Sequence, residues 1–60
     1  MFETEEIERV ASDLAGMSGV DLATAGQRQR RVWLARGLAL MHLAAGDMPE
    51  AQKVMAGVAA

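Results

Sequence analysis

The sequence predicts an all-α protein of three helices, of which the last two form an antiparallel helical hairpin. Hydrophobic residues make up 52% of the chain and are mainly Ala, Leu, Val and Met, which favour helix over sheet, whereas aromatic residues make up only 3%. Apolar residues also recur at helical spacing in separate segments. The chain of 60 residues has room for about three helices in one small domain, residues 1–60.

The first helix is expected over about residues 4–15. Thr4 is a suitable N-cap, and Gly16 is the expected stop. One face carries apolar side chains at the i, i+3, i+4 and i+7 positions: Ile7, Val10, Ala11 and Leu14. Because acidic residues dominate the other face, the helix is amphipathic and should pack through one side only.

A connector is expected at residues 16–24. Three glycines and two hydroxyl residues lie within residues 16–26, a composition typical of loops. Val20 and Leu22 are the connector residues expected to pack on the core.

The second helix is expected over about residues 25–45, with two possible starts. Thr24 and Gln27 have the spacing of a capping box, which places the start at Thr24. In the alternative register the helix begins near Ser18 and runs through Gly26, at a cost of about 1 kcal/mol relative to alanine.

The third helix, about residues 48–58, has the clearest start. Gly46 suits the left-handed end of the preceding helix, Asp47 is a good N-cap, and Pro49 and Glu50 belong in a first turn. The apolar positions that follow again have helical spacing: Ala51, Val54, Met55 and Val58. Such a short turn between two helices predicts the antiparallel hairpin.

The second helix is apolar on nearly all sides over residues 32–45, where only Arg36 and His42 interrupt it. Two short neighbouring helices are too small to cover such a helix. The chain has no cysteine, so disulfides cannot support its small core, and we expect a second copy or a larger protein partner to complete it. The residues expected at this protein interface are Trp33, Leu34, Arg36, Leu38, Leu40 and Met41.

Residues 33–59 resemble a single tetratricopeptide-type helix pair. That family repeats a leucine followed by a small residue, an aromatic residue four positions after the leucine, a Gly-Asp turn, and an alanine five positions after the glycine. The matching positions are Leu38, Ala39, His42, Gly46, Asp47 and Ala51. His42 replaces the aromatic residue, the closing proline is absent, and one unit stands where about three stack into an array. The resemblance implies a protein-binding hairpin, as in adaptors and assembly chaperones; an unrelated antiparallel hairpin with a Gly-Asp turn is the alternative.

An arginine-rich segment at the start of the second helix suggests a different function. Arg28, Arg30 and Arg31 could contact nucleic-acid phosphates, especially if a dimer joined two such segments. On a helical wheel these three and Arg36, which follows them, form a ring rather than a stripe. The alternative is that these arginines pair with the acidic first helix, within the chain or across a dimer. Residues 1–26 hold six acidic and one basic side chain, and residues 27–60 hold five basic and two acidic ones, which gives formal charges of −5 and +3.

Catalysis, cofactor binding and metal binding are not expected. The hydroxyl residues have simpler roles as caps, helix surface or turn residues, and His42 is the single imidazole of the chain. No Gly-rich phosphate loop is present. Because the sequence shows neither a basic targeting segment nor an apolar run of about 20 residues, we expect a cytoplasmic protein that does not enter a membrane.

These features together predict a non-enzymatic protein–protein interaction module, such as a small subunit, adaptor, assembly chaperone or protein inhibitor. Its expected partner is itself or a larger protein. The alternative is a small dimeric regulator that binds nucleic acid through Arg28, Arg30 and Arg31.

Overall fold

The structure is a computed structural model that describes residues 2–59, and within this range it contains three helices and no strand. The helices are α1 (Thr4–Met17), α2 (Gln27–Ala44) and α3 (Met48–Ala59). This arrangement confirms the all-α, three-helix prediction. None of the described helices combines the length and the apolar character needed to cross a membrane.

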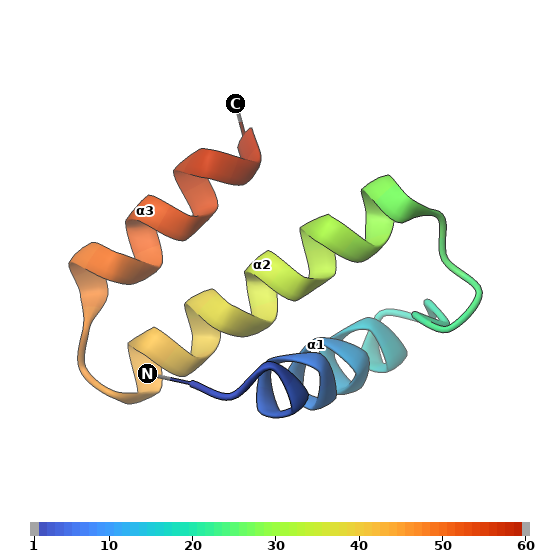
Figure 1. The fold of residues 1–60 in the computed structure, drawn as a ribbon, viewed down its shortest axis with the longest axis horizontal. Helices are drawn as coiled ribbons and strands as arrows, with labels where there is room; N and C mark the ends of the chain where they lie inside the picture. The colour runs from blue at the N-terminus through green and yellow to red at the C-terminus, as the bar shows by residue number, and fades with distance from the viewer. Residues whose placement is uncertain (1, 60) are drawn as a thin grey trace.

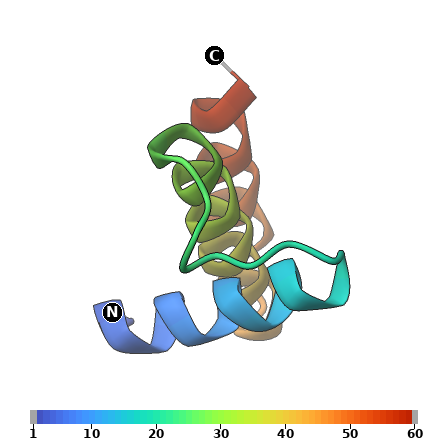
Figure 2. The ribbon, with the colours of Figure 1, turned by 90° about the vertical axis from the view of Figure 1, so that its right-hand side faces the viewer.

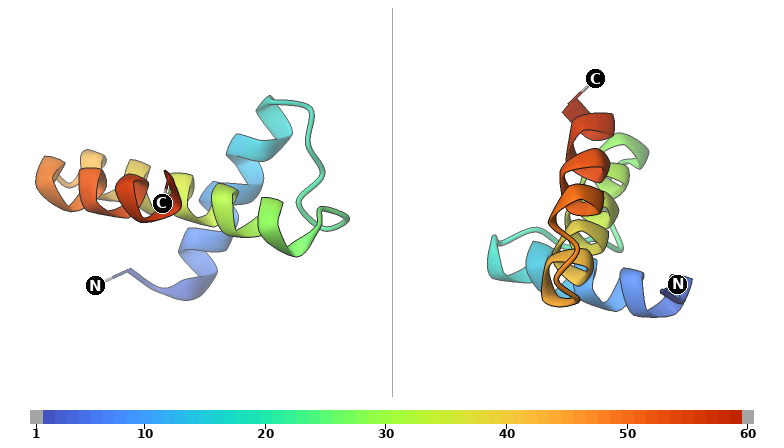
Figure 3. Two further views of the ribbon diagram at one scale, coloured as in Figure 1. Left: turned by 90° about the horizontal axis from the view of Figure 1, so that it is seen from above. Right: turned by 90° about the vertical axis from the view of Figure 1, so that its left-hand side faces the viewer.

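Helix α2 is the centre of the fold, because α1 and α3 both pack against it and do not contact each other (Figure 1). Helices α2 and α3 lie side by side and run in opposite directions, which confirms the hairpin (Figure 1). Helix α1 instead crosses α2 steeply, as Figures 2 and 3 show. The three helices therefore do not form a bundle around a common centre, and α2 has a separate contact with each neighbour.

Helix α1 ends two residues later than about residue 15, so the prediction that Gly16 stops it is wrong. Gly16 remains helical, and Gly19 adopts the left-handed conformation with φ of 79°. The N–H of Val20 donates to the carbonyl of Ala15 at 2.8 Å, and the N–H of Gly19 donates to the carbonyl of Gly16 at 3.1 Å. These two bonds form a Schellman motif, which satisfies the last carbonyls of the helix. The start is also corrected, since Glu3 is the N-cap residue and Thr4 is the first residue of the helix.

The connector explains why α2 begins at Gln27 rather than at either predicted start. The hydroxyl of Thr24 donates to the carbonyl of Asp21 at 3.2 Å, and an Asp21 carboxylate oxygen accepts the N–H of Ala23 at 3.1 Å. Thr24 is thus part of a turn and does not cap the helix, and Gly26 is the N-cap residue instead. Leu22 is buried, as expected.

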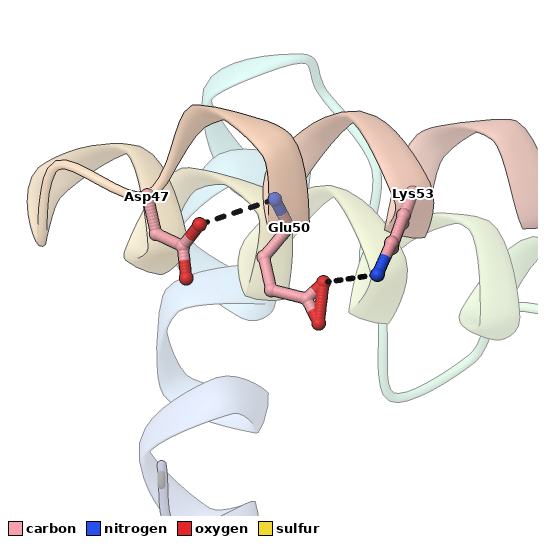
Figure 4. A network of polar contacts seen from close by, with 3 residues as sticks. All are labelled: Asp47, Glu50 and Lys53. Atoms are coloured by element: carbon pink, nitrogen blue, oxygen red, sulfur yellow. Dashed lines mark hydrogen bonds and ion pairs between the residues drawn. The ribbon is translucent and has the colours of Figure 1, made fainter.

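The turn between α2 and α3 matches its prediction. Gly46 has a φ of 82°, and the N–H of Asp47 donates to the carbonyl of His42 at 2.8 Å, as in the Schellman motif at the end of α1. A carboxylate oxygen of Asp47 accepts the N–H of Glu50 at 3.2 Å and so caps α3 (Figure 4).

Replacing Asp47 by alanine is expected to lower the free energy of unfolding by about 1 kcal/mol, because an N–H in the first turn of α3 loses its acceptor. A urea titration followed by Trp33 fluorescence measures this loss. Asp47→Asn keeps a side-chain acceptor and should retain most of the stability. A loss from the asparagine variant as large as that from alanine would contradict the capping role.

The core consists mostly of small side chains. Ala11, Ala15, Leu22 and Trp33 form the buried cluster between α1, the connector and α2. Between α2 and α3, Ala39 and Ala51 are buried. Among the residues whose burial is described, no large side chain is completely inaccessible to solvent. Helix α2 therefore packs against each neighbour through small side chains, and each contact buries little apolar surface.

Candidate protein-binding groove

The open face of α2 between α1 and α3 holds an apolar hollow. Leu34, Ala35 and Leu38 of α2 form its floor, Ile7 of α1 forms one wall, and Val54 of α3 forms the other. The hollow has a volume of about 340 Å³. It exists because α1 and α3 pack on different sides of α2 and leave the strip between them uncovered (Figure 1).

Toward the first turn of α2, this hollow continues into a second one of about 530 Å³. The two hollows share Leu34 and Ala35, and the second is bordered by Arg28, Arg31 and Val58. The groove therefore has a basic end.

Toward the last turn of α2, the central hollow continues into a third one of about 580 Å³. These two share Ile7 and Leu38. The third hollow ends at Phe2 and His42, whose rings lie edge to face with centroids 5.0 Å apart. We call the three connected hollows the α2 groove; it runs along most of the helix and is apolar in its middle.

The central hollow is bordered by charges of both signs. Glu8 of α1 and Arg30 of α2 both line it. In residues 2–59 the only ion pair is between Glu50 and Lys53 of α3, with a nitrogen-to-oxygen distance of 3.7 Å (Figure 4). Within this part of the chain, then, no acidic residue of α1 forms an ion pair with an arginine of α2, which was the within-chain pairing that the sequence left open.

The structure separates the arginine cluster into three environments. Arg30 lies toward α1, where its Nη1 donates to the carbonyl of Leu22 at 3.3 Å. Arg36 places its guanidinium carbon 4.7 Å from the centre of the Trp33 ring, a cation–π contact. Arg28 and Arg31 are exposed and border the same hollow at the basic end of the groove. These environments adjoin one another, because Arg28 lines one hollow with Arg31 and another with Arg36.

The residues expected at a protein interface do not lie on one surface. Leu34 and Leu38 line the groove. Trp33 is only 8% exposed and belongs to the core, so its ring is not a surface contact. Leu40 is 44% exposed but lies two residues after Leu38 and therefore on another side of α2.

The remaining two expected interface residues lie outside the groove lining. Arg36 is exposed and covers Trp33, and Met41 is half-buried. Sequence reasoning did not single out Ile7 and Val54 as binding residues, although both stood at apolar helical positions. Their role as groove walls depends on the helix crossing, which a periodic pattern does not specify.

Potential metal ligands do not gather in the part of the chain that the structure describes: no three His, Asp or Glu side chains lie together there.

Comparisons with known proteins returned no matching family model, no matching curated protein and no matching solved structure.

Proposed function

We propose that the chain is a non-enzymatic protein-binding module whose binding surface is the α2 groove. The observation that carries this proposal is the continuous apolar strip along α2, bounded by Ile7 on one side and Val54 on the other. Contiguous apolar surface of this kind is typical of protein contact sites. A small subunit, adaptor, assembly chaperone or protein inhibitor could each use it.

The surface area of the chain supports this proposal. A compact monomer of 6.4 kDa is expected to expose about 3,800 Å². This chain exposes 4344 Å². The chain therefore exposes roughly 550 Å² more than an average folded monomer of this mass, as expected of a chain that has surface to offer a partner.

The resemblance of residues 33–59 to a tetratricopeptide-type pair is consistent with protein binding. Its small residues Ala39 and Ala51 are the buried contacts between α2 and α3, and they allow close approach of the two helices. Protein binding through the groove does not require this resemblance, because the groove also includes residues of α1.

The geometry favours protein binding over nucleic-acid binding. Arg30 donates to the carbonyl of Leu22, and the exposed Arg36 lies over the Trp33 ring, whereas Arg28 and Arg31 are the exposed pair at the groove end. Two adjacent arginines supply few phosphate contacts, so the nucleic-acid alternative predicts weak binding that falls steeply with salt.

The proposal is tested by placing a photo-cross-linking amino acid at Leu38 and irradiating the native host cells. We expect a discrete adduct of defined mass, because Leu38 lies in the centre of the groove. The matched control position is Gln29, which is exposed on another side of the same helix. Adducts of equal yield from both positions, or none from Leu38, would rule out the groove as the binding surface.

A further inference from the structure

We propose that the occupant of the α2 groove is an acidic, amphipathic segment of another protein, whose carboxylates contact Arg28 and Arg31 at the basic end. Its apolar side chains fill the central hollow over Leu34 and Leu38. This proposal rests on the proposed function and names the chemistry of the partner. The charges that line the groove, and the partners that they lack within the chain, point to it.

The charge of the groove changes along its length. The hollow at the basic end is lined by Arg28 and Arg31 and, within the described chain, by no acidic residue. The central hollow has one charge of each sign, Glu8 and Arg30. At the far end lies Asp47, whose carboxylate caps α3. Positive charge without a counter-charge therefore lies at one end of the groove, and a complementary occupant carries negative charge at that end and apolar side chains beyond it.

Arg28 and Arg31 do not serve the fold through any polar contact. Both are exposed, and neither side chain forms an ion pair or a hydrogen bond within residues 2–59. They lie near the start of α2, where the helix dipole disfavours positive charge, and the first turn contains no acidic residue. Residues that oppose local stability without a compensating contact are typical of functional sites. Because the two arginines are one helical turn apart, their guanidinium groups can hold neighbouring carboxylates through paired hydrogen bonds.

An acidic protein segment fits this end of the groove better than nucleic acid does. Val32 and Val58 line the basic hollow, which continues through Leu34 into the central one. Phosphate groups would leave this apolar surface uncovered. Among the described residues, no aromatic side chain lines either hollow, so nucleic-acid bases would find no ring on which to stack. A peptide that places leucine or valine beside aspartate or glutamate supplies both kinds of contact.

The test begins with a display library of random peptides of about 16 residues, with the full chain as bait. From Arg28 to His42 the groove follows α2 for about 21 Å, which a peptide of this length can span. We expect the selected peptides to carry at least two acidic residues next to apolar ones. The dissociation constants of the labelled peptides are then measured by fluorescence anisotropy.

A chain with Arg28→Glu and Arg31→Glu should bind the selected peptides at least about tenfold more weakly. Peptides whose acidic residues are replaced by lysine should bind this reversed chain instead. The matched control is Arg9→Glu with Lys53→Glu, which makes the same change in net charge at exposed residues outside the three hollows. The control chain should keep its affinity within about twofold. Circular dichroism checks that each variant is helical, and acidic residues near the start of α2 suit its dipole.

The proposal is overturned if no peptide is selected, if the selected peptides lack acidic residues, or if reversed and control chains bind them equally. A DNA or RNA oligonucleotide that binds more tightly through the same two arginines also overturns it, as does a chain that light scattering shows to be a dimer by itself. If acid-free peptides bind and lose affinity for a helical Leu38→Asp or Val54→Asp chain, the acidic partner is excluded and the proposed function stands. If no peptide needs the groove and cross-linking at Leu38 gives no adduct, both are excluded.

Discussion

Replacing Gly37 by leucine is expected to abolish the packing of α1 on α2. A Cβ atom at Gly37 would lie 2.9 Å from the backbone nitrogen of Ala11 and 3.1 Å from its Cα. These are backbone atoms of α1, so the contact can be relieved only by moving the helix. We expect a loss of about 3 kcal/mol or more, by analogy with severe overpacking of a core. A chain of this length has a total stability of about 3–9 kcal/mol, so the variant should be largely unfolded or should lose α1.

Gly37→Ala provides a graded version of this experiment, and Gly57→Ala is its matched control. Both changes gain helix propensity of up to about 1 kcal/mol. A Cβ at Gly57 meets no atom within 4 Å, whereas one at Gly37 meets α1. Gly57→Ala should therefore raise the urea midpoint slightly and Gly37→Ala should lower it, with Trp33 fluorescence as the readout. If Gly37→Ala were as stabilising as Gly57→Ala, the close crossing of α1 and α2 would be wrong.

Local signals explain which parts of this fold could be predicted from the sequence. The turn at Gly46 and Asp47 was predictable because a left-handed glycine and a capping carboxylate act within a few residues of each other. The end of α1 could not be predicted in this way, because Gly16 and Gly19 both suit a helix end. Gly19 is the one that adopts the left-handed conformation, within the hydrogen bonds of the Schellman motif. Thr24 had a capping spacing, but its hydroxyl donates to the carbonyl of Asp21 within a turn, and the helix begins only after Gly26.

The groove could be predicted only in part. The apolar circumference of α2 indicated that one of its surfaces stays uncovered, and Leu34 and Leu38 were named for it. The sides of α2 that α1 and α3 cover are set by the close approach of α1 at Gly37 and by the small residues Ala39 and Ala51 at the contact with α3. These contacts join segments that are distant in sequence, and a periodic pattern does not report them. For this reason Trp33, which is buried in the core, and Leu40, which is exposed, were both expected at the same interface.

Trp33→Ala is expected to remove most of the helix content, because Trp33 is a core residue. The residue is 8% exposed and packs with Ala11, Ala15 and Leu22. Removing a buried tryptophan typically costs about 3–5 kcal/mol, which is a large part of the stability of so small a chain. Circular dichroism during urea titration measures the loss, since the variant has no tryptophan fluorescence.

Leu40→Ala is the matched control, because Leu40 lies on the same helix with 44% of its surface exposed. We expect this change to cost less than about 1 kcal/mol. Both variants are compared at one protein concentration, since self-association would add to the apparent stability. A Trp33→Ala chain that kept its helix content and lost only its association would show that the ring acts at an interface. The tryptophan would then belong to the contact between chains, and the core between α1 and α2 would rest on Leu22, the alanines and the partly buried side chains packed against them, Leu14, Val20 and Leu34.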